Sequence, residues 1–133
     1  MTVIDASAIV RLLLRLPLAE AAEEHIFDAQ ERSAAPDLLN AEVLHALRRF
    51  ERRGELDADR SAAAIQDLSV LPIARYPTIA LLERAWELRH NFTAYDALYV
   101  ALAEALDTSL VTSDEHLASA VHADARVSVI LLA

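Results

Sequence analysis

A nearly all-apolar helix in the last third of the chain restricts the possible folds more than any other segment. Residues 94–103 are apolar or aromatic except for Asp96. A helix with so little polar surface is normally buried inside a domain. The chain then turns at Asp107, enters a short apolar run at 110–111 and reaches Asp114. The segment therefore predicts a buried helix, a turn and a strand, with one acid in the first helical turn and another just past the strand.

Apolar runs and helical spacing alternate along the rest of the chain. Strands are predicted at 3–4, 33–36, 73–76, 110–111 and 127–132, the last as a buried strand. Helices are predicted at 6–15, 17–30, 39–54, 57–71, 78–90, from 93 to the turn at 107, and at 115–121. Strands separated by helices indicate βαβ units and a mostly parallel sheet. A length of 133 residues suits a single domain spanning 1–133.

Charge and cysteine content limit the classes of function. The chain has a net charge of −9, and all twelve of its basic residues are Arg. Such a protein repels nucleic acid as a whole, so a phosphate substrate would need a metal ion or clustered Arg. The absence of Cys excludes disulfides and thiolate metal sites. No uncharged apolar run approaches the roughly 18 residues of a membrane span. We therefore expect a cytoplasmic protein that does not enter a membrane.

Three aspartates stand at predicted element junctions, where two interpretations compete. Asp5 and Asp114 each follow a strand and precede a helix, and Asp96 lies three residues after Thr93. All three positions suit helix N-caps or a capping box, so a purely structural role explains each residue taken singly. The carboxyl ends of parallel strands are also where α/β sheets bind ligands. Both interpretations stay open for these residues.

Glu42 is harder to explain as a structural residue. The apolar stripe of its predicted helix runs through Leu39, Val43, Ala46, Leu47 and Phe50. Glu42 is three residues after the start of that stripe, so it lies at the edge of the buried face. An unpaired buried carboxylate costs several kcal/mol or takes up a proton. We therefore expect a cation nearby, and without Lys the choice is between an Arg and a metal ion.

Taken together, the four acids suggest one site. Asp5 and Asp114 lie at strand ends, while Glu42 and Asp96 lie on helices that can overhang the same edge of the sheet. Carboxylate ligands, with the hydroxyls of Ser7 and Thr112 nearby, select a hard cation such as Mg²⁺ or Mn²⁺.

Four segments resemble those of the PIN-domain ribonucleases, and most closely the VapC-like toxins of type II toxin–antitoxin pairs. The segments are Asp5-Ala6-Ser7, Asn40-Ala41-Glu42, residues 93–104 and Thr112-Ser113-Asp114. They span essentially the whole chain in order, and residues 93–104 are the most specific part. The resemblance implies a three-layer α/β/α sandwich around a mostly parallel sheet.

The same resemblance implies an activity and its residues. It implies a Mg²⁺- or Mn²⁺-dependent endoribonuclease toxin with Asp5, Glu42, Asp96 and Asp114 as catalytic metal ligands, supported by Ser7 and Thr112. Its partners would be RNA and a VapB-like antitoxin, in a homodimer or a toxin–antitoxin hetero-oligomer. The alternatives are a PIN-fold nuclease acting on DNA or structured nucleic acid, and a non-catalytic PIN interaction module.

A cluster of arginines follows Glu42 along the same predicted helix. Arg48, Arg49 and Arg53 are the candidates for binding substrate phosphates, and Arg49 and Arg53 lie roughly on the side of Glu42. The structural alternative is a solvated helix end with a favourable interaction between Arg and the helix dipole.

Overall fold

The computed structural model describes residues 1–124 and 126–133. Its strands are β1 (Thr2–Ile4), β2 (Ser33–Pro36), β3 (Ile73–Tyr76), β4 (Leu110–Thr112) and β5 (Val129–Leu131). They form one sheet in the spatial order β3-β2-β1-β4-β5, and every neighbouring pair is parallel. The chain builds the sheet outward in one direction from β1 to β3 and then returns to add β4 on the other side of β1. The carboxyl ends of β1 and β4 therefore form the crevice in which open α/β sheets bind ligands.

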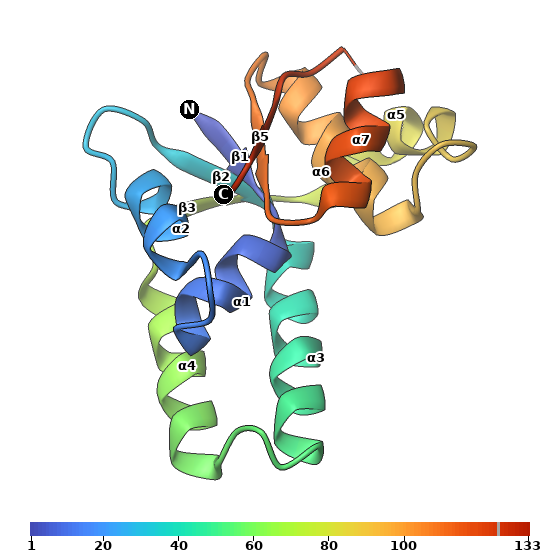
Figure 1. Ribbon diagram of the computed structural model, residues 1–133. Coiled ribbons are helices and arrows are strands. Elements are labelled where there is room, and N and C mark those ends of the chain that lie inside the picture. The colour runs from blue at the N-terminus through green and yellow to red at the C-terminus, as the bar shows by residue number, and fades with distance from the viewer. Residues whose placement is uncertain (125) are drawn as a thin grey trace.

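The helices form two layers on opposite sides of this sheet (Figure 1). They are α1 (Ala6–Leu14), α2 (Ala19–Ile26), α3 (Leu38–Arg52), α4 (Ala58–Val70), the 3₁₀ helix η1 (Thr78–Leu81), α5 (Leu82–Glu87), α6 (Ala94–Ala105) and α7 (Glu115–Asp124). Helix α1 packs on α2, α3 and α4, whereas α6 packs on β1, β2 and α5. This arrangement confirms the predicted α/β/α sandwich with a parallel sheet. None of the helices in the described part of the chain combines the length and apolarity needed to cross a bilayer.

Burial of α6 accounts for its unusual composition. Its residues 97 and 99–103 are almost completely inaccessible to solvent. Ala97, Ala101 and Ala103 are small, which lets the backbone of α6 approach the sheet closely. The buried faces of α1 and α3 complete the core on the other side, as the apolar stripe predicted for α3 indicates. The layers thus fix the starts of α1, α3 and α6 relative to the ends of β1 and β4.

Two predicted helices are shorter in the structure than in the sequence prediction. The helix predicted to reach residue 30 ends at Ile26 because the Asp28 side chain accepts a hydrogen bond from the Gln30 backbone N–H, which forms a turn. The helix predicted for 78–90 is divided into η1 and α5 and ends at Glu87. Beyond it, the buried side chains of Leu88 and Phe92 hold a turn that delivers the chain to α6.

Of the predictions for Gly54 and for the final strand, the structure confirms the first and corrects the second. Gly54 has a φ of 73° after the end of α3, and Glu55 N–H bonds back to Phe50 C=O, so Gly54 terminates the helix as predicted. The final strand, by contrast, is not buried on all sides. Strand β5 lies at the edge of the sheet, and Ile130 and Leu131 are 37% and 41% exposed. An apolar run alone does not distinguish a central strand from an edge strand whose outer side is open.

Candidate active site

The hydroxyl groups around Asp5 hold its carboxylate in a fixed orientation at the carboxyl end of β1. Asp5 is 5% exposed, and its Oδ1 accepts hydrogen bonds from Ser7 Oγ at 2.7 Å and from Ala8 N–H at 3.2 Å. Its Oδ2 accepts one from the buried Thr112 hydroxyl at 2.6 Å. Asp5 therefore caps α1 with one oxygen and contacts the end of β4 with the other. The hydrogen-bond donors are neutral, so they orient the negative charge without cancelling it.

Asp114 and Asp96 also perform the capping roles that the sequence suggested. Asp114 Oδ1 accepts hydrogen bonds from the backbone N–H groups of His116 and Leu117 at the start of α7. At the start of α6, the cap is the Thr93 hydroxyl, which accepts from the Asp96 backbone N–H at 3.2 Å. Thr93 is thus the cap residue; its side chain also lowers the pKa of the Asp96 carboxyl, although burial raises that pKa by more. The structural interpretation is correct for these positions, yet it leaves carboxylate oxygens available for a second role.

Within the described residues, Glu42 has no cationic partner to compensate for its burial. Its Oε1 is buried and has no hydrogen-bond partner, and the described part of the chain gives its carboxylate no salt bridge. The buried Tyr99 hydroxyl also has no hydrogen bond of standard geometry, but it lies close enough to Glu42 to lower the pKa of that carboxyl, less than burial raises it. The cation expected from the sequence is therefore not an Arg in this structure.

The four carboxylates influence one another electrostatically. Burial is the largest cause that raises the pKa of Asp5, to about 6, and the negative charge of Asp96 raises it further. Burial also raises the pKa of Glu42, and the charges of Asp96 and Asp5 add to that effect. The pKa of Asp96 is raised first by burial and then by the charge of Asp114. The fold has brought four acids from distant parts of the sequence into one region of negative potential.

The carboxylates do not form a closed cage around a single point. Across residues 1–124 and 126–133, no three His, Asp or Glu side chains lie close enough together to hold a metal ion as they stand. Four like charges repel one another, which favours side-chain positions that keep them apart. The four-carboxylate metal site therefore stays a prediction.

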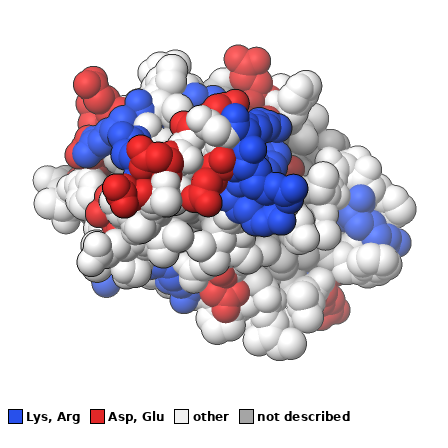
Figure 2. All heavy atoms as spheres, turned by 90° about the horizontal axis from the view of Figure 1, so that it is seen from below, with Lys and Arg blue, Asp and Glu red and all other residues white. Residues whose placement is uncertain are grey.

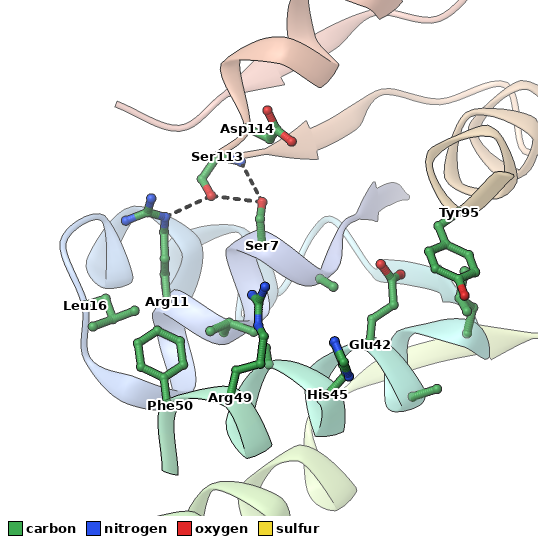
Figure 3. Close-up of a pocket in the computed structure, with 15 residues that line it drawn as sticks. Ser7, Arg11, Leu16, Glu42, His45, Arg49, Phe50, Tyr95, Ser113 and Asp114 are labelled. Carbon is green, nitrogen blue, oxygen red and sulfur yellow. Dashed lines mark hydrogen bonds between the residues drawn. The ribbon is translucent and has the colours of Figure 1, made fainter. Parts of the chain in front are cut away.

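A pocket of about 730 Å³ opens beside these acids, between α1 and α3 (Figure 3). Glu42 and Asp114 lie at its acidic end, together with Ser7 and Ser113. Apolar side chains of α1 and α3 and the turn after α1 line the remainder, including Val10, Leu16, Leu38, Ala46 and Phe50. The pocket therefore combines an acidic end with an apolar groove.

The structure separates the predicted arginines. Arg49 lines the pocket, whereas Arg48 and Arg53 are exposed and do not line it. Figure 2, which views the molecule from the side of the α3–α4 connection, shows several separate groups of basic side chains, the largest of them with acidic side chains beside it. Substrate binding by Arg48 and Arg53 stays a prediction.

Sequence reasoning missed three residues near the acids. Arg11 lines the pocket and donates from Nε to Ser113 Oγ at 2.9 Å. The sequence feature that could have identified Arg11 is its four-residue spacing from Ser7, which places both residues on one face of α1. Tyr95 is 60% exposed and lines the same pocket. Tyr99 appeared only as part of an apolar helix, although its three-residue spacing from Asp96 directs its hydroxyl to the same side.

Without a divalent cation, the protein is expected to become more stable as the pH falls from about 7.5 to about 5.5. Native Asp5 takes up a proton near pH 6, whereas unfolded Asp5 stays ionised down to about its ordinary pKa of 3.8. The folded state binds more protons in that window, so the free energy of unfolding rises as pH falls through it. Glu104 has the opposite shift, because Arg84 lowers its pKa, but its contribution is lost only below its ordinary value of 4.5.

Thermal unfolding in a chelator at the two pH values measures this effect. Asp107→Asn is the matched control, because Asp107 is exposed and its φ of 50° suits Asn. The control should show the same rise in Tm as the wild type. A Tm that falls over this pH range would show that burial of Asp5, Glu42 and Asp96 does not control the titration.

Comparison with known proteins places the chain in a family. A PIN-domain family profile matches residues 2–122. VapC ribonuclease Mb0985 of Mycobacterium bovis is 41% identical over 130 residues, covering 98% of both chains. Ribonuclease VapC1 of Mycobacterium tuberculosis is 53% identical over 89 residues, covering 66% of this chain and 67% of the relative.

Solved structures agree with this placement. The crystal structure of PAE2754 from Pyrobaculum aerophilum aligns with a TM-score of 0.67 and 27% identity over 96% of this chain and 81% of that one. Mycobacterium tuberculosis VapC20, described as a toxin that cleaves the sarcin–ricin loop, aligns with a TM-score of 0.64 over 90% of this chain and 95% of its own. At 17% identity this second likeness concerns the fold alone. The chain therefore belongs to the PIN-domain family, and to the VapC group within it.

Proposed function

We propose that the protein is a divalent-metal-dependent endoribonuclease and the toxin of a toxin–antitoxin pair. In this proposal residues 1–133 form a single PIN domain that acts in the cytoplasm. The observation that carries the proposal is the buried, unpartnered Oε1 of Glu42 among three further acids at the β1–β4 crevice. Similarity to curated VapC ribonucleases supports the reaction class.

The residues around the crevice fit Mg²⁺ or Mn²⁺. Asp5, Glu42, Asp96 and Asp114 would hold the ion through oxygen atoms, which are the ligands that hard cations prefer. A bound ion of this kind supplies activated water and neutralises negative charge at a scissile phosphate. The chain lacks Cys, so thiolate ligands are absent, and the hydrogen-bond network of Asp5 contains hydroxyl and backbone groups; His45 lines the pocket beside Glu42.

The residues that surround the ligands supply orientation. Ser7 and Thr112 hold the Asp5 carboxylate with short hydrogen bonds, and the Thr112 hydroxyl also accepts from the Asp114 backbone N–H at 3.0 Å. Thr112 is completely buried, so this link between the ends of β1 and β4 is rigid. Rigid placement of ligands before substrate arrives is what makes electrostatic catalysis effective.

Adding Mn²⁺ or Mg²⁺ at millimolar concentration is expected to raise the Tm by about 5 °C or more, because the ion binds only the native cluster of carboxylates. Differential scanning calorimetry with NaCl at matched ionic strength measures the specific part of the shift. Asp107→Asn should show the full shift and Asp96→Asn a much smaller one. A Tm that does not respond to Mn²⁺ would rule out the proposed site.

Cleavage of total cellular RNA by purified protein with Mg²⁺ or Mn²⁺, followed by mapping of the ends, tests the function. Single-stranded and duplex DNA of matched length form the parallel arms. Cleavage of DNA in preference to RNA would favour the alternative of a DNA-directed or structure-specific nuclease. Inactivity toward every substrate, with intact folding and metal binding, would favour a non-catalytic interaction module.

The proposal also includes assembly. A VapB-like antitoxin would bind the pocket between α1 and α3, and the complex would be a hetero-oligomer, with a homodimer as the form of the free protein. Exposed apolar side chains on η1 and α5 support a protein interface, since Ile79 and Trp86 are 74% and 68% exposed.

A further inference from the structure

Two arginines line the α1–α3 pocket from opposite walls. Arg11 belongs to α1 and reaches toward Ser113, whereas Arg49 belongs to α3 and points toward α1 (Figure 3). The chain carries a net charge of −9, so acids are abundant enough to pair with every Arg. Within residues 1–124 and 126–133, however, neither of these two forms a salt bridge. Two uncompensated cations therefore face a pocket in an acidic protein.

Arg11 is held in place by neutral groups. Its Nε donates to Ser113 Oγ at 2.9 Å and its Nη1 donates to the Pro17 carbonyl at 3.0 Å. The Ser113 hydroxyl is in turn 2.9 Å from the Ser7 hydroxyl, which bonds to Asp5. These contacts fix the guanidinium beside the acidic end and leave its Nη2 without a protein partner in the hydrogen bonds described. A fixed guanidinium with free N–H groups is suited to a phosphate oxygen.

An exposed aromatic side chain completes the pocket. Tyr95 precedes Asp96 at the start of α6, is 60% exposed and lines the pocket beside Glu42. A large exposed aromatic side chain next to an acidic cluster has no packing role that explains it. In proteins that bind single strands, exposed aromatic side chains are platforms on which unpaired bases stack, while arginines bind the backbone.

From these observations we infer that the pocket binds an unpaired RNA strand along Glu42 and Asp114, the two of the four acids that line it, with Arg11 and Arg49 on backbone phosphates and Tyr95 stacked on a base. The inference rests on the proposed ribonuclease function and names the residues that bind the substrate. The strand would run from Tyr95, past Glu42 and Asp114, to the two arginines. A duplex would not offer a free base to Tyr95, so binding by these three residues favours unpaired RNA.

The test measures binding of a fluorescein-labelled single-stranded RNA of about 12 nucleotides. Binding is measured with Mg²⁺ in the Asp96→Asn background, so that the strand stays intact. Arg49→Gln is the principal variant, because Arg49 has no hydrogen bond or salt bridge in the described structure whose loss would affect folding. Arg52→Gln is the matched control, since Arg52 is exposed on the same helix and does not line the pocket.

Arg11→Gln and Arg49→Gln are each expected to raise the Kd for the RNA strand about tenfold, because each removes one charge-assisted hydrogen bond to a phosphate. Each should also reduce the slope of log Kd against log salt concentration by about 0.7, which is the value expected when one phosphate contact to a single strand is lost. Arg11→Lys keeps the charge and should restore the salt slope. Tyr95→Ala should raise the Kd about tenfold, whereas Tyr95→Phe should not. In the otherwise wild-type enzyme, the arginine variants should raise KM and leave kcat nearly unchanged.

Three results would overturn the inference. One is a wild-type protein that cleaves RNA while Arg49→Gln binds the strand with unchanged Kd and salt slope; that result would leave the ribonuclease function standing. Another is an Arg49→Gln protein with unchanged RNA binding that fails to bind an antitoxin, which would assign the arginines to acidic groups of that partner. The third is a duplex RNA that binds as tightly as the single strand. A wild-type protein that neither binds nor cleaves RNA would contradict both proposals.

Discussion

Replacing Asp96 with Asn is expected to reduce RNA cleavage by a factor of at least ~10³ while the protein stays folded. The change removes one negative charge from the four-carboxylate site and keeps the size of the side chain. Burial and the neighbouring Asp114 charge raise the pKa of Asp96 more than the Thr93 side chain lowers it, so the charged carboxylate is destabilised in the folded protein and its loss should not unfold the chain. Single-turnover cleavage of a mapped RNA substrate, with Tm recorded for each preparation, measures both properties.

Thr93→Ala supplies the control that separates a catalytic role from a capping role. The Thr93 hydroxyl accepts from the Asp96 backbone N–H, and that bond does not involve the Asp96 carboxylate. Thr93→Ala should therefore cost about 1 kcal/mol of stability and leave most of the activity. Asp96→Asn should instead abolish most of the activity and leave the stability nearly unchanged. If Asp96→Asn unfolds the protein and its activity loss follows the unfolding, the capping role explains Asp96 and the metal role is wrong.

The sequence predicted the layers of the fold and the elements that carry the four acids, but not the order of the strands. Asp5 and Asp114 could be assigned to one edge because each follows an apolar run, and parallel strands end at the same edge of a sheet. The strand order itself did not follow from the sequence. Pairing of β1 with β4 joins residues more than a hundred positions apart, and no local pattern specifies which strand takes that place.

Arg11 and Tyr99 show why part of the site was missed. Arg11 sits on an otherwise apolar helix, where a single Arg is usually a solvated residue, and its partner Ser113 is 102 positions away. Tyr99 counts as apolar in any periodicity, and only the folded arrangement of α6 on the sheet places its hydroxyl near Glu42. Glu42 was found because a carboxylate at the edge of an apolar stripe conflicts with local patterning, and such conflicts are typical of functional sites.

The second large effect concerns inhibition. Co-expression with the product of the adjacent open reading frame is expected to suppress cleavage almost completely. The pocket between α1 and α3 has the apolar lining that an amphipathic helix requires, and its acidic end attracts a basic side chain. An Arg or Lys from the partner would compete there with the metal ion. Pull-down of the neighbouring product, followed by an RNase assay of the complex, measures binding and inhibition together.

A pair of substitutions on α3 locates the binding surface. Ala46 lines the pocket, whereas Leu44 is 47% exposed and does not line it. Ala46→Gln fills the groove and should weaken antitoxin binding at least ~10-fold, as overpacking of a tight contact does. Leu44→Gln should bind normally. The toxin freed by Ala46→Gln should still cleave RNA, since the substitution adds no charge beside the four acids, but with a raised KM because the RNA strand would use the same groove.

The results of these binding and cleavage assays separate the toxin–antitoxin role from the nuclease activity. A neighbouring product that does not bind, or that binds without reducing cleavage, would remove the toxin–antitoxin role and leave the nuclease intact. Equal weakening by Ala46→Gln and Leu44→Gln would place the antitoxin elsewhere on the protein. If Ala46→Gln alone escapes inhibition, the partner and the RNA strand share the groove between α1 and α3. Inhibition then follows from geometry, because an occupied groove leaves the substrate no path to Glu42 and Asp114.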